Sequence, residues 1–463
     1  MILFEGKILP DEQLDNVLEK LWDSCVDAVA NRRDVVELVI NACGRVSEKI
    51  KSGAYNEILL PLLENGVFTR GQMEEAIAFF DRENLLLKYN TELGVLRAEM
   101  EANRQQLMEA GTDAMSLVGG HGVIEKRLEP LGILFHIAAG NAEGLPFFSV
   151  IEGLLAGNVN ILKLPSMDDG ISVMLLHEMI KEEPSLAPYV CVLDVPSTNV
   201  KILKALADMA DAIVVWGGDE AVMAARTMAS PATQIISWGH KLSFAYVSED
   251  VVSELLRDCP VDDESTSEEQ NKKSCAEKEL YDLARHICET KQLLCSSCQG
   301  IFVDTEDEAV VDFVAQKFLH ILEEVSVDYP QETIGVRGKV SISLYNEELE
   351  STYSGRKILR GKGVSVIIAT DSELELSYMF KNCWVKPLPR QNIIKALKGK
   401  KGYLQTVGLI CADEERGDLA DVFAKTGLTH IARPKNMSQM LPGGTHDGEY
   451  PLRRYSRIVE VER

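Results

Sequence analysis

Short apolar runs alternate with helix-length amphipathic segments through the middle of the chain. Runs rich in β-branched residues predict strands at 131–137, 159–164, 190–195, 212–216 and 234–238. The segments between them predict helices near 146–155, 171–181, 198–209 and 220–228. Repeated strand–helix–strand units imply a parallel sheet with right-handed crossovers, so we expect an α/β fold with a doubly wound nucleotide-binding domain.

The regions on either side of this core follow other patterns. From 11 to about 111, apolar residues recur at helical spacing, as at Leu14, Val17 and Leu21, which predicts a helical layer packed on the main body. After a predicted helix at 281–291, further apolar runs predict a second α/β region with strands at 364–369, 383–388 and 405–411. An alternating segment at 455–461 predicts a last strand. The acid-rich segment 259–275 interrupts this pattern and predicts a mobile surface insertion.

The charge balance narrows the classes of partner. With 48 Lys and Arg against 72 Asp and Glu, the formal net charge is −24, which disfavours binding to nucleic acid or to an anionic membrane surface. A polyanionic cofactor would need local help from helix N-termini and a few placed basic residues. The start of the chain does not read as a signal sequence, and no apolar run is long enough for a bilayer, so we expect a cytoplasmic protein whose ten cysteines are mostly free thiols.

A small polar segment, 291–303, holds Cys295 and Cys298 and leads into an apolar strand. A thiol in a turn beside small side chains is accessible to a substrate, and nearby backbone N–H groups favour the reactive thiolate. We therefore interpret Cys295 as a nucleophile. Two cysteines at this spacing also suit a redox pair, or a zinc site completed by His286 and Cys288.

The run from Glu129 to Asn141 resembles the strand and turn that end in an asparagine in the aldehyde dehydrogenase superfamily, and specifically in its acyl-CoA reductase branch, typified by the luminescence-type fatty-acyl reductases. Four later segments resemble family motifs in the same order, at 155–166, 214–220, 237–241 and 292–299. The resemblance covers the chain from about Glu129 to its C-terminus. It implies an aldehyde-dehydrogenase-like fold in which a second α/β domain carries the nucleophile.

The resemblance also implies catalytic roles. Cys295 would attack the thioester carbonyl of an acyl-CoA. Asn141 and the backbone N–H of Cys295 would then stabilise the oxyanion, and loss of one such donor typically costs about 3 kcal/mol of barrier. Independently of the family, Asn141 is also suited to cap the helix that follows it.

On the cofactor side the resemblance implies contacts from Lys163, Ser166, Gly217, Gly218 and Trp238. Many relatives carry an acidic residue at the place of Ser166, where it would bind the ribose and repel a 2′-phosphate. Serine there leaves room for NADPH, which we favour over NADH. We expect no bound metal.

Departures from the family pattern are informative. Where hydrolysing relatives have the glutamate that activates water, this chain has Ser237 and Trp238. Without that base the acyl-enzyme would survive until hydride arrives, which favours acyl-CoA reduction over oxidation to a free acid. No acid lies at 383–388, where the family has a second glutamate, and Cys298 replaces a usual proline.

These features predict NADPH-dependent reduction of a fatty acyl-CoA to the aldehyde. The alternatives are a CoA-acylating dehydrogenase acting on short aldehydes, and a non-catalytic zinc or redox-cysteine protein on a degenerate dehydrogenase fold. The predicted parts are a helical region (1–112), a nucleotide-binding domain (113–240), a catalytic domain (241–430) and a C-terminal segment with an oligomerisation strand (431–463). By resemblance we also expect a homo-oligomer and an acyl-protein ligase as partner.

Overall fold

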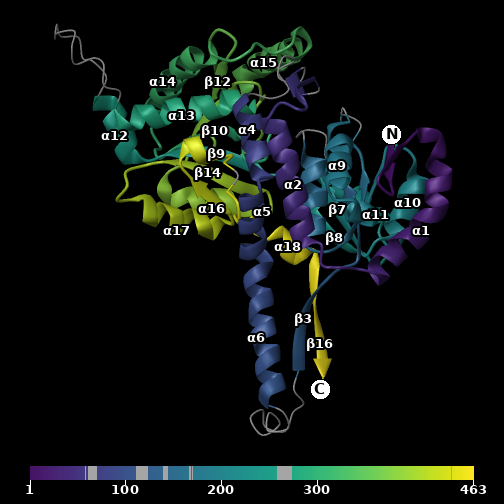
Figure 1. The fold of residues 1–463 in the computed structure, drawn as a ribbon. Helices are drawn as coiled ribbons and strands as arrows, with labels where there is room; N and C mark the ends of the chain where they lie inside the picture. Colours follow the sequence, from purple (N-terminus) through teal and green to yellow (C-terminus); the bar gives the residue numbers. More distant parts are fainter. Residues whose placement is uncertain are drawn as a thin grey trace. The chain divides into compact units, whose positions relative to one another are not determined.

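The computed structural model describes residues 1–57, 59–60, 70–110, 124–138, 144–165, 168, 170–257, 274–439 and 441–462. The chain divides into two compact units (Figure 1). The first unit comprises Met1–Gly239 and Met440–Arg463, and the second comprises His240–Gln439. Each unit is built around its own β-sheet.

The sheet of the first unit contains all five predicted strands, in the order β6, β5, β4, β7, β8, and these are parallel. Their bounds are β4 Ile133–Ile137, β5 Val159–Lys163, β6 Val190–Leu193, β7 Ala212–Trp216 and β8 Gln234–Trp238. Two strands that the sequence pattern missed, β1 (Ile2–Phe4) and β2 (Lys7–Leu9), extend the sheet antiparallel beyond β6. The strand order reverses beside β4, which is where open α/β sheets bind ligands.

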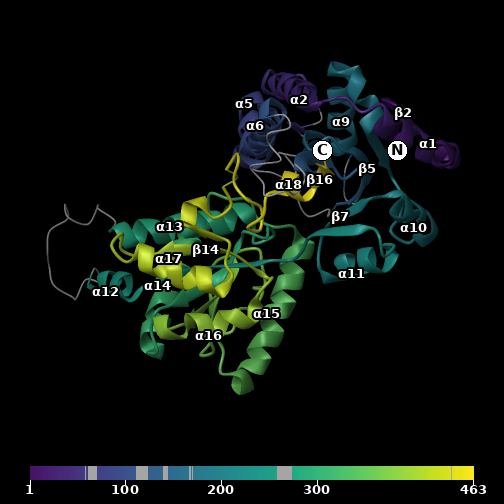
Figure 2. The ribbon, with the colours of Figure 1, turned by 90° about the horizontal axis from the view of Figure 1, so that it is seen from below.

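Helices cover both faces of this sheet, which confirms the doubly wound α/β class. The described helices of this unit are α1 Leu14–Ala30, α2 Val36–Lys51, α4 Arg70–Phe79, α5 Arg82–Tyr89, α6 Val95–Ala110, α8 Leu145–Leu155, α9 Ile171–Glu182, α10 Val200–Met209, α11 Asp219–Met228 and α18 Pro451–Arg454, of which α6 packs along β3 instead of on the large sheet. Figure 2 shows α2 and α9 on one side of the sheet and α10 and α11 on the other. As the helical pattern predicts, α1 buries Val17 and Leu21.

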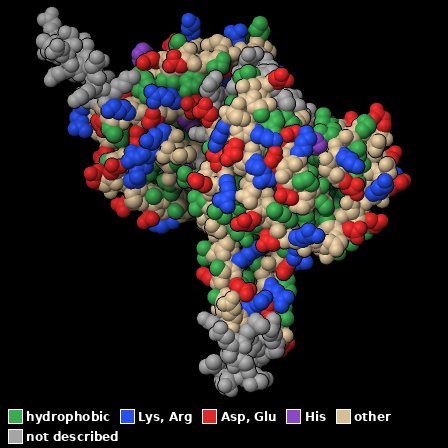
Figure 3. All heavy atoms as spheres, in the orientation of Figure 1, with side chains coloured by type: hydrophobic (Ala, Val, Ile, Leu, Met, Phe, Trp, Pro, Cys, Tyr) green, Lys and Arg blue, Asp and Glu red, His purple; other side chains and the backbone are tan. Residues whose placement is uncertain are grey.

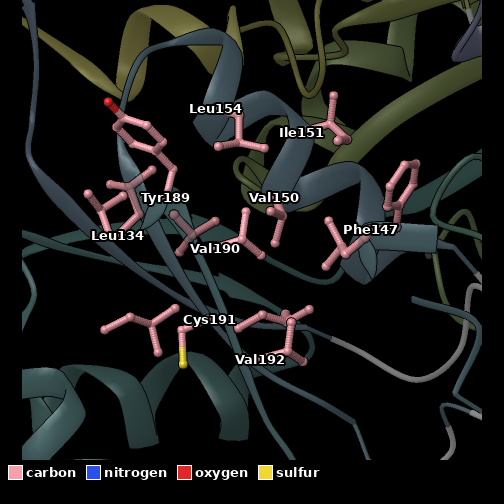
Figure 4. Packing of buried hydrophobic residues seen from close by; sticks show 14 of the residues in the cluster. Leu134, Phe147, Val150, Ile151, Leu154, Tyr189, Val190, Cys191 and Val192 are labelled. Carbon is pink, nitrogen blue, oxygen red and sulfur yellow. The ribbon is translucent and has the colours of Figure 1, made fainter. Parts of the chain in front are cut away.

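Helix α8 packs on the sheet through an apolar side. Its residues Phe147, Val150 and Leu154 are buried in the same core cluster as Leu134 of β4 and Val190 of β6 (Figure 4). The helix begins directly after Gly144, whose φ of 75° lies in the left-handed region that glycine adopts without strain. The apolar contact therefore fixes a helix that begins near the point where the strand order reverses.

A buried polar network joins α8 to three strands. The His136 ring lies 2.7 Å from Ser149 Oγ and 3.0 Å from Asn160 Oδ1, and Trp216 Nε1 donates to the same Ser149 hydroxyl at 2.9 Å. Burial lowers the pKa of His136 to about 4, so the ring is neutral. A Cβ at Gly153 would lie 1.8 Å from Asn160 Oδ1. Glycine is therefore required for α8 to approach the network this closely.

The C-terminal segment returns to the first unit. Its strand β16 (Ser456–Glu462) pairs antiparallel with β3 (Ile124–Pro130) over the whole length of both. Before β16, the backbone N–H of Leu452 donates to Glu92 Oε2 at 2.8 Å. Glu92 and Glu152 both form ion pairs with the buried Lys88, at 2.5 and 2.8 Å. These contacts anchor the returning segment in the interior of the unit.

The second unit has a seven-stranded sheet in the order β11, β12, β13, β10, β9, β14, β15. The strands are β9 Leu242–Val247, β10 Cys298–Val303, β11 Lys357–Arg360, β12 Ser365–Ile368, β13 Asn382–Pro387, β14 Leu404–Ile410 and β15 His430–Ala432. Its helices are α12 Glu249–Arg257, α13 Cys275–Thr290, α14 Glu308–Ser326, α15 Ile334–Ser354, α16 Ile393–Leu397 and α17 Arg416–Thr426. The helices form two separate core clusters with the sheet, one containing α13 and α14 and the other containing α16 and α17.

The predicted end of the catalytic domain at 430 and the predicted insertion at 259–275 can be compared with the structure. Position 430 falls in β15, which pairs with β14, so the second unit continues beyond the predicted end of its domain. The predicted acidic insertion lies, up to residue 273, outside the described residues.

Among the helices that are described, none combines the length and the apolar character needed to cross a membrane.

The close approach at Gly153 gives a test of the α8 packing. We expect Gly153→Ala to lower the free energy of unfolding by about 1–3 kcal/mol, because the methyl group displaces Asn160 from the buried network. The matched control is Gly335→Ala in α15, where an added Cβ meets nothing within 4 Å. Both changes replace a helical glycine by alanine, so equal urea unfolding curves for the two variants would contradict the packing argument.

Candidate active site

The loop from Lys291 to Ser297 joins α13 to β10 and carries Cys295. Lys291 and Gln292 have φ angles of 50° and 62°, in the left-handed region that residues other than glycine rarely adopt. Such strain persists only where surrounding contacts hold the backbone, and it concentrates at functional sites. The sharp turn after α13 therefore needs support from elsewhere in the unit.

Two buried glutamine side chains supply this support. Gln292 donates from Nε2 to the Cys298 carbonyl at 3.1 Å and to Ser377 Oγ at 3.0 Å, and its Oε1 accepts from the Lys381 N–H at 3.1 Å. Gln299 donates from Nε2 to the Gln292 carbonyl at 3.2 Å and accepts from Ser377 Oγ at 2.8 Å. Each amide donates through its nitrogen and accepts through its oxygen, so the two buried side chains hold the loop in place.

Cys295 is half-buried at the tip of this loop. Its Sγ accepts a hydrogen bond from Gln405 Nε2 at 3.3 Å. Its carbonyl accepts from Ser243 Oγ at 2.7 Å, and that hydroxyl in turn accepts from the Thr406 N–H at 3.1 Å. A donor aimed at sulfur stabilises the charged thiolate, which is the nucleophilic form. The contacts thus fix the position of the Cys295 thiol and place a hydrogen-bond donor at its sulfur.

Cys298 is not a loop residue, contrary to the sequence interpretation. It is the first residue of β10 and is fully buried, and its thiol donates to the Gly300 carbonyl at 3.2 Å. Burial raises the pKa of Cys298 to about 12. Burial likewise raises the pKa of Cys288 to about 12, and that of Cys383 well above the ordinary value. These buried thiols are chemically inert, in contrast to Cys295.

His286 supports the loop from inside the unit. Its Nε2 accepts a hydrogen bond from the Cys298 N–H at 3.2 Å. Burial lowers the pKa of His286 to about 4, against an opposing hydrogen bond with the Ser296 backbone, so the ring stays neutral. The zinc set considered from the sequence is not assembled: within the described ranges, no three His, Cys, Asp or Glu side chains are grouped so that they could hold a metal ion.

The carboxyl edge of the first sheet brings together several predicted cofactor residues. Lys163 ends β5 and is almost fully buried, with Nζ donating to Ser197 Oγ at 3.0 Å. Burial lowers the pKa of Lys163, while the charge of Asp194 raises it. Gly217 and Gly218 follow β7, and an added Cβ at Gly218 would enter open space. A ligand backbone or phosphate can therefore approach this turn closely.

The helix N-termini at this edge differ in charge. The first turn of α8 contains no acidic residue, so its backbone N–H groups and its dipole favour an anion such as a pyrophosphate. By contrast, α11 begins with Asp219 and Glu220, whose charges oppose an anion there. The α8 end is therefore the better anchor for a dinucleotide.

Trp238 ends β8, but its side chain is only 3% exposed. The indole packs on Trp216 with ring centroids 5.5 Å apart and edge-on to His446 at 4.8 Å, and the Arg454 guanidinium lies 5.0 Å from its ring. Its Nε1 donates to Tyr455 Oη at 3.3 Å. Trp238 thus forms a supporting wall at this edge, and direct contact with a cofactor remains a prediction.

Comparison with known families identifies this arrangement. The profile of the family described as Acyl-CoA reductase (LuxC) matches residues 36–458. The chain belongs to this family. A long-chain acyl-protein thioester reductase of Vibrio harveyi is 22% identical over 440 residues, which cover 90% of this chain and 86% of that protein. A second such reductase, of Photobacterium leiognathi, is 24% identical over 72% of this chain and 65% of its own length.

Solved structures show the same fold at low identity. A bifunctional proline utilization A protein superposes with a TM-score of 0.64 at 14% identity, over 99% of this chain. The chain spans 46% of that larger protein. GapN of Methanocaldococcus jannaschii, a glyceraldehyde-3-phosphate dehydrogenase complexed with NADP, superposes with a TM-score of 0.63 at 12% identity, over 98% of this chain and 95% of that one. The resemblance inferred from the sequence and the aldehyde-dehydrogenase-like fold are confirmed, and this LuxC-family chain is an oxidoreductase of that superfamily.

Sequence reasoning reached some residues of this reductase and missed others. Asn141 and Ser166, predicted for the oxyanion and the ribose, lie outside the described residues. Gln405 and Ser243, which contact Cys295, were not anticipated. Both are polar residues near the start of otherwise apolar strands, and this pattern is a usable signal because a buried polar group in a strand needs a partner.

The difference in burial predicts which thiols react. Iodoacetamide should alkylate Cys295 and the exposed Cys275 in the native protein, whereas Cys288, Cys298 and Cys383 should react only after unfolding in urea. Peptide mass spectrometry at several times of reaction measures each site separately. Native labelling of Cys298 at the rate of Cys295 would contradict the structure.

The hydrogen bond to Cys295 can be tested by its effect on reactivity. Gln405→Leu removes the donor, so we expect alkylation of Cys295 at neutral pH to slow by roughly tenfold and its rate to rise only at higher pH. The control is Gln316→Leu on the surface of α14. Superimposable rate profiles for wild type and Gln405→Leu would show that the amide does not stabilise the thiolate.

Proposed function

We propose that this LuxC-family chain catalyses the NADPH-dependent reduction of a fatty acyl thioester, with acyl-CoA as donor, to the aldehyde in the cytoplasm. The observation that carries the proposal is the half-buried Cys295, held by Ser243 and hydrogen-bonded at sulfur by Gln405. The family match and the nucleotide-binding sheet of the first unit support the same reaction.

The first step takes place at Cys295. Its thiolate forms a new bond to the thioester carbonyl carbon, and the carbon–sulfur bond to CoA then breaks, with CoA leaving as its thiolate. The Gln405 amide stabilises the Cys295 sulfur before attack, while the Cys295 carbonyl is fixed by Ser243. Asn141 and the Cys295 N–H remain the predicted donors to the transient oxyanion. The product of this step is an acyl thioester on Cys295.

The residues of the carboxyl edge fit a nicotinamide dinucleotide. Bound there, NADPH would supply the hydride that reduces the acyl carbon. In the proposal Lys163 contacts a ribose, and the open backbone at Gly218 and the N-terminus of α8 support binding of the pyrophosphate. Ser166 favours NADPH over NADH. After reduction, Cys295 leaves as thiolate and releases the aldehyde, so the same thiolate serves as nucleophile and as leaving group.

Water must be kept from reacting with the acyl thioester. At the place of the glutamate in hydrolysing relatives, β8 ends in Ser237 and Trp238. Neither side chain carries a carboxylate that could activate water. The Trp238 indole packs instead against Trp216 and His446. This replacement supports reduction of the thioester rather than its hydrolysis.

The acyl donor could be a CoA thioester or a protein thioester. The family profile is described as an acyl-CoA reductase, whereas the Vibrio harveyi relative is named an acyl-protein thioester reductase. A thioester on CoA and one on a protein offer the same carbonyl chemistry to Cys295. We propose that the enzyme accepts the CoA ester directly, that it forms a homo-oligomer, and that an acyl-protein ligase is its partner if a protein carries the acyl group.

Substitution of the nucleophile tests the reaction. With an acyl-CoA series of increasing chain length, Cys295→Ala should lower acyl-dependent NADPH oxidation at least about a thousandfold, because no covalent intermediate can form. Intact-protein mass spectrometry of wild type with acyl-CoA and no NADPH should show an acyl adduct that maps to Cys295. The matched control, Cys298→Ala, should keep the activity.

Activity retained by Cys295→Ala, or an adduct on another residue, would overturn the assignment. Rates in both directions distinguish the alternative reaction, since a CoA-acylating dehydrogenase would prefer short aldehydes with NADP⁺ and CoA. The rates of NADPH oxidation with acyl-CoA and with an acylated ligase protein, at equal concentration, show which donor the enzyme uses.

A further inference from the structure

A cavity of about 460 Å³ lies in the first unit, away from the predicted cofactor edge. Its lining includes Pro130 and Gly157, which lie shortly before the starts of β4 and β5. Cofactors bind at the carboxyl ends of such strands, and this cavity lies at their amino ends. Its volume is in the range of small-molecule sites.

The lining of the cavity is basic, although the protein as a whole is strongly acidic. Six cations line it, namely Arg32, Arg33, Arg97, Arg104, Lys126 and Arg127. The described lining residues include three carboxylates, on Asp34, Glu101 and Glu129. Two of the cations also have acidic partners outside the lining, since Arg127 pairs with Glu125 and Lys126 with Glu460. The residues come from the turn before α2, from α6 and from β3. Figure 1 shows α6 and β3 side by side, and Figure 3 shows blue and red side chains together along this part of the surface.

The three carboxylates already have partners. Glu129 pairs with Arg32, and Glu101 lies 3.5 Å from Arg104. Asp34 uses Oδ1 to accept the Val36 N–H at the start of α2, at 3.1 Å. Arginines therefore match the charges of Glu129 and Glu101, and a backbone N–H holds one oxygen of Asp34.

Two of the arginines keep their charge unneutralised. No ion pair or hydrogen bond of the Arg33 side chain is found within the part of the chain that the structure describes. Arg97 donates from Nη1 only to the neutral Tyr89 hydroxyl at 3.0 Å, and its buried Nε has no hydrogen-bond partner among those residues. A guanidinium group carries five N–H donors, so most of these remain available to a ligand.

We infer that this cavity is a binding site for a small oxyanion, a phosphate or carboxylate group carried on a compact apolar body. Arginine forks bind such groups with paired, charge-assisted hydrogen bonds. The apolar body is accommodated by Val35, Met100 and Leu128, which line the same cavity. The inference does not depend on the proposed reaction, because the site lies at the opposite edge of the sheet from the residues assigned to the cofactor.

Binding is tested on the full chain by isothermal titration calorimetry with three probes. Inorganic pyrophosphate presents the phosphate alone, adenosine 5′-monophosphate adds a compact body, and octanoate presents a carboxylate on an apolar chain. At low salt we expect at least one probe to bind with a Kd of about 1 mM or tighter. Raising the salt concentration should weaken binding by screening the arginine charges.

The variants locate the site. Arg33→Gln and Arg97→Gln should each weaken binding about tenfold, while Arg226→Gln, an arginine on α11, should leave it unchanged. Lys163→Gln at the cofactor edge should also leave it unchanged. Thermal unfolding of each variant shows whether the fold is retained, and Arg33→Gln, at an exposed turn, keeps the test valid if Arg97→Gln does not fold.

Binding of only the two phosphate probes would identify a phosphate site, and binding of only octanoate would identify a carboxylate site. Absence of binding by all three probes would overturn the inference. It would also be overturned by binding that is sensitive to Lys163→Gln and insensitive to the arginine substitutions, because the anion would then be at the cofactor edge.

Discussion

The first unit depends on how closely α8 can approach its sheet. Gly153 allows this approach, since any side chain there would occupy the position of the Asn160 carboxamide. The same carboxamide and Ser149 contact the fully buried His136, and burial keeps its ring neutral against the opposing effect of the Asn160 hydrogen bond. Buried polar networks of this kind are favourable only when their members are satisfied together, so one methyl group at Gly153 would affect all of them. The network thus sets where the N-terminus of α8 presents its backbone N–H groups.

In the second unit the corresponding constraint is the strained turn after α13. Positive φ angles at Lys291 and Gln292 are unfavourable for isolated residues, and the buried amides of Gln292 and Gln299 offset this cost through paired hydrogen bonds. A nucleophile must be held to a fraction of an ångström if it is to attack along a defined path. The strained turn and the amide contacts together fix Cys295 without burying it, as the proposed nucleophile requires.

Much of this fold was accessible from the sequence, because β-branched runs and helix-length spacers report parallel α/β units directly. The five central strands lie where the pattern predicts them. The N-terminal strands were missed because β1 and β2 are only three residues long, too short for periodicity to register. Cys298 was misplaced because a cysteine next to small polar residues looks like part of a loop, whereas its burial depends on α13 and β13 packing around it. Gln405 lies 110 positions from Cys295, and no local pattern can report such a contact.

The packing around Trp238 bears on the proposed loss of the water-activating glutamate. A carboxylate at the end of β8 would have to be desolvated against Trp216 and His446, or else would draw water into the site. The indole instead packs on both rings and uses its N–H on Tyr455, a residue of the returning C-terminal segment. That segment is itself anchored through Glu92 and the buried Lys88. A glutamate at the position of Trp238 would therefore require this aromatic cluster to be rebuilt as well, which is consistent with the proposed reduction rather than hydrolysis of the acyl thioester.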